Sequence, residues 1–144
     1  MGTTRRVRTG AVVLLAVVGV VGLVVFAATR PGPDLAALRA DAVARWVPAG
    51  GTLTRTHETR SGTTLGKPVY AGVTRVFSAP DPDAALEAAE ALADSTGWQV
   101  DTRRPDSVGA SREIPDYRLE LTVVRATVDG VPGNLFLYLA AYPA

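Results

Sequence analysis

The feature that most constrains this chain is an uninterrupted apolar run close to its N-terminus. Residues 11–28 contain no charged side chain, and 12 of these 18 residues are Val, Leu or Phe. As an α-helix the run would span about 27 Å, close to the roughly 30 Å hydrocarbon core of a bilayer. Its large apolar side chains favour insertion by roughly 4–7 kcal/mol. The run therefore predicts one transmembrane helix over residues 11–28.

The charges beside this run predict its orientation. Arg5, Arg6 and Arg8 precede it, and no acidic residue lies among the first ten. Basic flanks stay on the cytoplasmic side of a membrane. We therefore expect a single-pass protein of the cell membrane with its N-terminus in the cytoplasm. Its parts would be a cytoplasmic basic tail over 1–10, the helix over 11–28, a linker over 29–33 and an extracytoplasmic domain over 34–144.

The same segment has an alternative interpretation as a cleaved signal peptide. Its basic start fits, and cleavage after Ala27 would place Val25 and Ala27 at the positions that favour small residues. The apolar part of a signal peptide usually has about 7–15 residues, so a run of 18 favours retention as a signal-anchor. If residues 1–27 were removed, the product would be a secreted soluble binding domain.

Composition narrows the chemistry open to the remainder. The chain has no cysteine, which excludes disulfides, thiolate metal sites and a cysteine-linked lipid. Three of the 15 basic residues lie in the tail, whereas all 14 acidic residues follow residue 33, so residues 29–144 carry a net charge of −2. That balance gives no electrostatic reason to bind nucleic acid. Arginine outnumbers lysine 14 to 1, a bias typical of GC-rich bacterial genomes.

Two stretches of the domain have the periodicity of amphipathic helices. Asp34 would cap the first, which runs to about Val47, with Asp41 paired to Arg45 on its solvent side. Asp81 would cap the second, which ends before Gly97. The side chains expected on the buried stripes are Leu35, Leu38, Ala42, Val43 and Trp46 in the first helix, and Ala85, Leu86, Ala89, Leu92 and Ala93 in the second.

Strand patterns fill most of the rest. The predicted strands cover residues 52–60, 69–79, 98–102, 117–128 and 135–142, with a connection over 61–68 and a long loop over 103–116. The first, which is polar and rich in threonine, is expected at a sheet edge, whereas the last is apolar on both faces and is expected at the centre. The order is α-β-β-α-β-β-β. It predicts an α+β fold with two helices on one face of a mostly antiparallel sheet of about five strands.

The only histidine, His57, begins a sequence that imitates a zinc-protease motif. His57 and Glu58 match the start of H-E-x-x-H, but Ser61 stands where the second histidine ligand belongs. We therefore expect no metal site and no cofactor. A tethered hydrolase that uses His57 with a serine or with carboxylates is an alternative function, although no Gly-x-Ser-x-Gly elbow is present. The glycine-rich segment over 62–68 fails the P-loop motif in spacing and is expected to be a hairpin loop.

Three aromatic residues give the one indication of a binding surface. Phe136, Tyr138 and Tyr142 lie on one face of the last predicted strand. We expect them to pack inward beneath a helix, because aromatic side chains in a strand with two apolar faces normally do. On an uncovered face they would instead form a patch for a protein partner. The sequence as a whole favours a non-catalytic binding or structural module of a bacterial cell envelope, held to the bilayer through residues 11–28.

Overall fold

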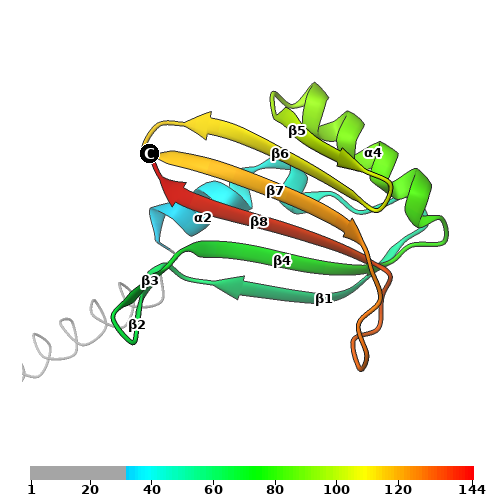
Figure 1. Cartoon of the computed structure of the whole chain (residues 1–144), viewed down its shortest axis with the longest axis horizontal. Coiled ribbons are helices and arrows are strands. Elements are labelled where there is room, and N and C mark those ends of the chain that lie inside the picture. Colours follow the sequence, from blue (N-terminus) through cyan, green and yellow to red (C-terminus); the bar gives the residue numbers. More distant parts are fainter. Residues whose placement is uncertain (1–31) are drawn as a thin grey trace, which may run out of the picture. The chain divides into compact units, whose positions relative to one another are not determined.

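The structure, a computed structural model, describes residues 32–144. The predicted basic tail over 1–10 and the predicted transmembrane helix over 11–28 lie outside the described residues. The helices are α2 (Pro33–Ala40), α3 (Ala42–Arg45) and α4 (Pro82–Ser95); the strands are β1 (Thr52–Thr59), β2 (Gly62–Thr64), β3 (Lys67–Val69), β4 (Ala71–Ser78), β5 (Gln99–Arg104), β6 (Ser107–Ile114), β7 (Tyr117–Arg125) and β8 (Leu135–Pro143) (Figure 1).

Six of these strands form one sheet in the order β1-β4-β8-β7-β6-β5, while β2 and β3 pair separately. Every neighbouring pair within the described sheet is antiparallel. The α+β class is therefore confirmed. The predicted element order is wrong in three places, because the first helix is broken in two, the expected hairpin loop over 61–68 contains the two short strands β2 and β3, and a sixth strand replaces the expected long loop. None of the helices within 32–144 is long and apolar enough to cross a bilayer.

The helices pack on one face of the sheet, which we call the covered face. Helix α2 contacts β4 and β8, and α4 contacts β5, β6 and β7. In Figure 1 both helices lie behind the sheet. Strand β8 supplies the centre of this core, as expected, because its neighbours β4 and β7 flank it on both sides. Its side chains on the covered face are almost inaccessible to solvent: Leu135, Leu137, Leu139 and Ala141.

Helix α4 forms as its sequence predicts. The Asp81 carboxylate accepts a hydrogen bond of 3.0 Å from the backbone N–H of Ala84 and so caps the first turn. Gly97 has a φ of 85° just beyond the last turn, which a glycine adopts without a steric penalty. The predicted stripe of small and aliphatic side chains faces the sheet: Ala85, Leu86, Ala89 and Ala93 are buried.

The first helix differs from the prediction because Asp41 interrupts it. Asp41 has a ψ of 142°, and its side chain accepts a 2.9 Å hydrogen bond from the N–H of Val43, so it caps a new helix, α3. It does not pair with Arg45 in solvent. Instead its buried carboxylate accepts hydrogen bonds from Trp98 Nε1 at 3.3 Å and Arg112 Nη1 at 3.1 Å. Nor is Asp34 the cap of α2, because Gly32 occupies that position.

Arg75, whose side chain lies on the covered face, binds the C-terminal end of α3. Arg75 of β4 donates from Nη1 to the carbonyl oxygens of Ala44 and Trp46, both at 2.8 Å. Carbonyls at a helix C-terminus lack partners in the helix, so a guanidinium at this place satisfies them and faces the negative end of the dipole. Burial lowers the pKa of Arg75. A second contact links α2 to the edge strand β1, because Arg39 of α2 donates a hydrogen bond to the carboxylate of Glu58. This hydrogen bond lowers the pKa of the Glu58 carboxyl.

Strand β6 stands where a long loop was expected. Its inward positions are Val108, Ala110, Arg112 and Ile114, and its outward positions are Ser107, Gly109, Ser111 and Glu113, as the pairing with β7 shows. Two of the inward side chains are small or charged, so the alternation that marks a strand is weak in the sequence. Arg112 is tolerated there because Asp41 is its partner.

The segment between β7 and β8 is held against β4 by Asn134. Its side chain donates to Ala79 O and accepts from Ala79 N, both at 2.8 Å, in the manner of a backbone strand pair. Gly133, the preceding residue, has a φ of 145°. A Cβ there would lie 2.6 Å from Val76 Cγ1 and 2.8 Å from Phe77 O, so only glycine fits.

Replacing Asp41 by alanine is expected to destabilise the domain by about 2–4 kcal/mol, because it removes a helix cap and leaves Trp98 and Arg112 without their buried acceptor. Urea unfolding of the full chain in detergent, followed by tryptophan fluorescence, measures this. The matched control is Asp94→Ala on the exposed face of α4, for which we expect little change. Equal effects of the two substitutions would contradict the structural role of Asp41.

Replacing Gly133 by alanine is expected to cost about 1–3 kcal/mol, since it adds backbone strain and a steric overlap with β4. The same unfolding measurement applies. Gly62→Ala is the control, because a Cβ at Gly62 meets nothing within 4 Å. An unchanged unfolding midpoint for Gly133→Ala would show that this connection does not pack as described.

Candidate binding surface

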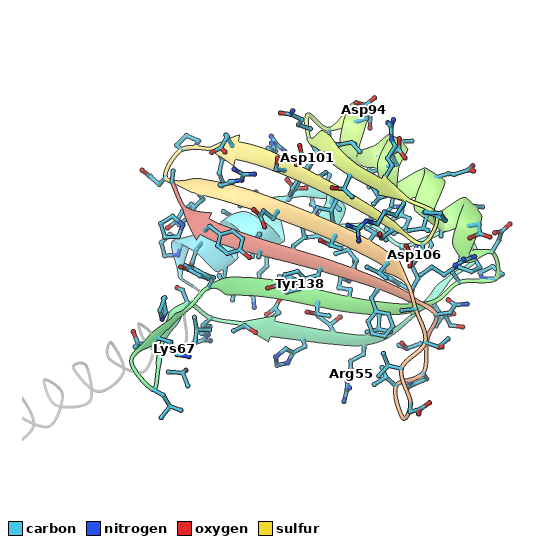
Figure 2. The ribbon with its side chains drawn as sticks, viewed as in Figure 1. Arg55, Lys67, Asp94, Asp101, Asp106 and Tyr138 are labelled. Atoms are coloured by element: carbon cyan, nitrogen blue, oxygen red, sulfur yellow. The ribbon has the colours of Figure 1, made fainter. Side chains whose placement is uncertain are left out.

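The second face of the six-stranded sheet, which points away from α2 and α4, is called the open face here. Strand register places one row of its side chains straight across the sheet: His57, Thr74, Tyr138, Thr122, Gly109 and Thr102. Within residues 32–144 no helix covers this row. Figure 2 shows Tyr138 near the middle of the sheet.

Tyr138 is the exposed centre of the open face. Its side chain is 44% exposed. A Cβ built on Gly72 of the neighbouring strand would lie 3.5 Å from both Cε2 and Oη of Tyr138, so the ring lies over the backbone of this glycine. A larger residue at position 72 would crowd the ring. Glycine thus lets a large amphipathic side chain lie across two strands, with its hydroxyl at the surface.

Beside Tyr138 the open face is hollowed toward its edge. We call this depression the β1–β8 hollow; its volume is about 410 Å³ and its lining is Arg55, Thr56, His57, Thr74, Val76, Val131 and Phe136. Val76 and Phe136 are paired in register and form an apolar floor. Arg55 and His57 of β1 stand on the outer side, so an apolar centre meets a polar rim.

The predicted aromatic residues do share one face, but the inward packing expected for them is wrong. Phe136, Tyr138 and Tyr142 lie on the open face, because the leucines that alternate with them in β8 occupy the covered face. Phe136 and Tyr138 adjoin the hollow. Tyr142 lies farther along the strand and packs on Tyr70, with ring centroids 4.8 Å apart. Burial raises the pKa of Tyr142, and the neighbouring Tyr138 and Glu120 raise it further, so its hydroxyl stays protonated.

His57 projects from β1 toward the open face, opposite Thr74 of β4. Among the described residues it makes no hydrogen bond to a serine or to a carboxylate. The neighbouring Glu58 points the other way in the strand and binds Arg39. Residues 32–144 contain no group of three His, Asp or Glu side chains placed to hold a metal ion. The structure thus brings His57 to the rim of the hollow and does not place it beside a catalytic partner.

A second depression lies between α4 and the β5–β6 turn, with a volume of about 410 Å³. Two ion pairs cross its walls: Arg103 with Glu90, and Arg125 with Asp83 at 2.6 Å. Because these charges neutralise each other locally, the depression has no excess of one sign to attract an ionic ligand. Sequence periodicity places Glu90 on a solvated helix face and so misses its partner, since Arg103 is distant in the chain.

The residues of the hollow that sequence reasoning misses are Thr74 and Val76 of β4 and Val131 of the β7–β8 connection. The period of two along β4 places Thr74 and Val76 on the same face of the strand but does not show which face the helices cover, and it carries no signal for Val131. Comparison with known proteins adds no relative: no known protein family, no curated protein and no solved structure matches this chain. What the open face does must therefore be inferred from its own chemistry.

Proposed function

We propose that this chain is a single-pass membrane protein that presents residues 34–144 outside the cytoplasm as a module for binding a protein partner of the cell envelope. The observation that carries the anchoring is the uncharged run over residues 11–28, preceded by Arg5, Arg6 and Arg8. In lipid the backbone of such a run must satisfy its hydrogen bonds internally, which favours a helix despite the many valines.

Few residues separate this run from the folded domain. The run ends at residue 28, and the described domain begins at Gly32. Four residues of extended chain reach at most about 14 Å. The module is therefore held close to the membrane surface, where its concentration relative to other membrane proteins is high.

The open face supports binding of a protein. Phe136, Val76 and Tyr138 give it an apolar and aromatic centre, and Arg55 and His57 give it a polar rim. Protein interfaces have this anatomy, with aromatic residues near the centre carrying much of the binding energy. A net charge of −2 for residues 29–144 gives no support to nucleic acid as the partner.

The irregular edge strands of the sheet favour a partner that contacts the open face over a partner that adds a strand to the sheet. Strand β1 is irregular between Leu53 and Arg55, where the Thr54 hydroxyl binds the carbonyls of Val76 and Pro132. Strand β5 is irregular between Val100 and Thr102. Bulges at an edge disturb the ladder that an added strand needs. Side chains of the open face are thus the groups available for recognition.

The absence of cysteine from the chain makes its topology directly measurable. In the Val128→Cys variant we expect a membrane-impermeant maleimide to label intact cells, because Val128 is 50% exposed and belongs to the extracytoplasmic domain. In the Thr3→Cys variant, within the basic tail, we expect labelling only after the cells are permeabilised.

Charge substitution in the tail is the matched control for this topology. Replacing Arg5, Arg6 and Arg8 by glutamate removes the positive-inside signal and is expected to reduce labelling of Val128→Cys in intact cells. Labelling of Thr3→Cys but not of Val128→Cys in intact cells would contradict the proposed orientation.

A photoreactive benzoylphenylalanine at position 138 tests the open face. We expect it to form a discrete cross-linked adduct with another protein in cells, because Tyr138 is the exposed centre of the surface. The same residue at position 94, on the exposed side of α4, is the control and should give none.

One further variant decides whether an adduct reflects recognition. Phe136→Ala, in the floor of the hollow, is expected to weaken the adduct from position 138, since hot-spot aromatic residues cost about 2 kcal/mol or more when truncated. Absence of an adduct from 138, or an equal adduct from 94, would contradict binding through the open face.

A further inference from the structure

The end of the domain that holds its first described residue, Gly32, is distinguished by an exposed leucine and several tyrosines. Gly32 lies beside Ser61, since a Cβ on Gly32 would be 3.9 Å from the Ser61 hydroxyl oxygen. The β2–β3 hairpin follows Ser61 directly and projects from the sheet at this end (Figure 1). The first residue of the domain and the hairpin are therefore neighbours. We call this region the entry end.

The tip of the hairpin is apolar and fully exposed. Thr64 and Lys67 pair across a turn of two residues, Leu65 and Gly66. Both turn residues have positive φ, 51° for Leu65 and 75° for Gly66, as in a type I′ turn. Folding alone favours asparagine or glycine at the first of these positions. A leucine that is 98% exposed stands there instead. Neither backbone preference nor packing within the domain explains this residue.

Tyrosines gather at the same end of the sheet. Tyr70 is 41% exposed where β3 passes into β4, and it packs on Tyr142. Tyr117 lies opposite Pro143 at the ends of β7 and β8. Three of the four tyrosines of the chain are thus at the entry end. Tyrosine is enriched where membrane meets water, because its ring is apolar and its hydroxyl is hydrated.

We propose that the β2–β3 hairpin inserts Leu65 into the interfacial layer of the same bilayer that holds the anchor, with Lys67, Tyr70 and Tyr142 at the level of the lipid headgroups. This inference rests on the anchoring proposed above. The inference follows from the position of Gly32, the first described residue. Gly32 is four residues from the apolar run in the sequence and lies beside the hairpin in the fold. The hairpin therefore lies next to the residue at which the tether joins the domain.

Attachment to the membrane anchor explains how one leucine can be sufficient to hold the hairpin in lipid. A single small apolar group binds lipid weakly when the protein is free in solution. Once the chain is anchored, insertion of the hairpin is intramolecular and needs no separate binding event. The contact is apolar, because Lys67 is the only basic residue within the hairpin. We therefore expect it to form equally on zwitterionic and on anionic lipid.

Spin labelling of the full chain in phosphatidylcholine vesicles tests this contact. A nitroxide on Thr64→Cys, beside the tip, is expected to be more accessible to oxygen, which partitions into lipid, than to a water-soluble nickel chelate. The control is Val128→Cys, which lies next to another two-residue turn, Asp129 and Gly130, at the opposite end of the sheet. There we expect the reverse order of accessibility.

The role of Leu65 itself is tested by adding Leu65→Asp to the Thr64→Cys chain. We expect the label to lose its preference for oxygen and to resemble the label at position 128. A label at 64 as water-accessible as that at 128, or one that ignores Leu65→Asp, overturns insertion of the hairpin. A requirement for added phosphatidylglycerol would also overturn it, because the contact would then be ionic.

The same vesicles separate this inference from the anchoring on which it depends. If the labelled chain stays with the vesicles after an alkaline wash while the label at 64 is hydrated, the hairpin inference fails and the anchor stands. If the chain is removed by the wash, both fail together.

Discussion

The buried carboxylate of Asp41 is the contact on which the arrangement of helices over the sheet depends. It caps α3, accepts from the indole of Trp98 after α4, and pairs with Arg112 of β6. A charge in the interior is stable only when such partners surround it, so these three elements are fixed relative to one another. Together with Arg75 under the end of α3, this contact holds α3 and the end of α4 on the covered face, where α2 also packs. The opposite face is left uncovered as a consequence.

The parts of the fold that sequence predicts are those whose periodicity is strong. Helix α4 has a cap, a regular stripe and a terminal glycine, and β7 alternates cleanly, so both are found where expected. Strand β6 is not, because Ala110 and Arg112 occupy inward positions where large apolar residues would give a signal. The sequence also predicts the wrong partner for Asp41. Its local spacing suggests a pair with Arg45, while its true partners are distant in the chain.

The candidate surface shows a different limit of sequence reasoning. The pattern of β8 predicts that Phe136, Tyr138 and Tyr142 share a face, and they do. It does not say which face the helices cover, since both faces of β8 are apolar. The leucines take the covered face, where they pack beneath α2 in the hydrophobic core, and the aromatic residues remain outward. The β1–β8 hollow then arises from residues of β1, β4 and β8, which only the sheet order brings together.

Retention of the apolar run is the claim from which the proposed location and the hairpin contact both follow. It is tested most directly by the mass of the chain recovered from cells after an alkaline wash of the membranes. The account predicts the full 15.0 kDa chain in the membrane pellet. A shorter chain that lacks residues 1–27, recovered in the soluble fraction, would contradict it.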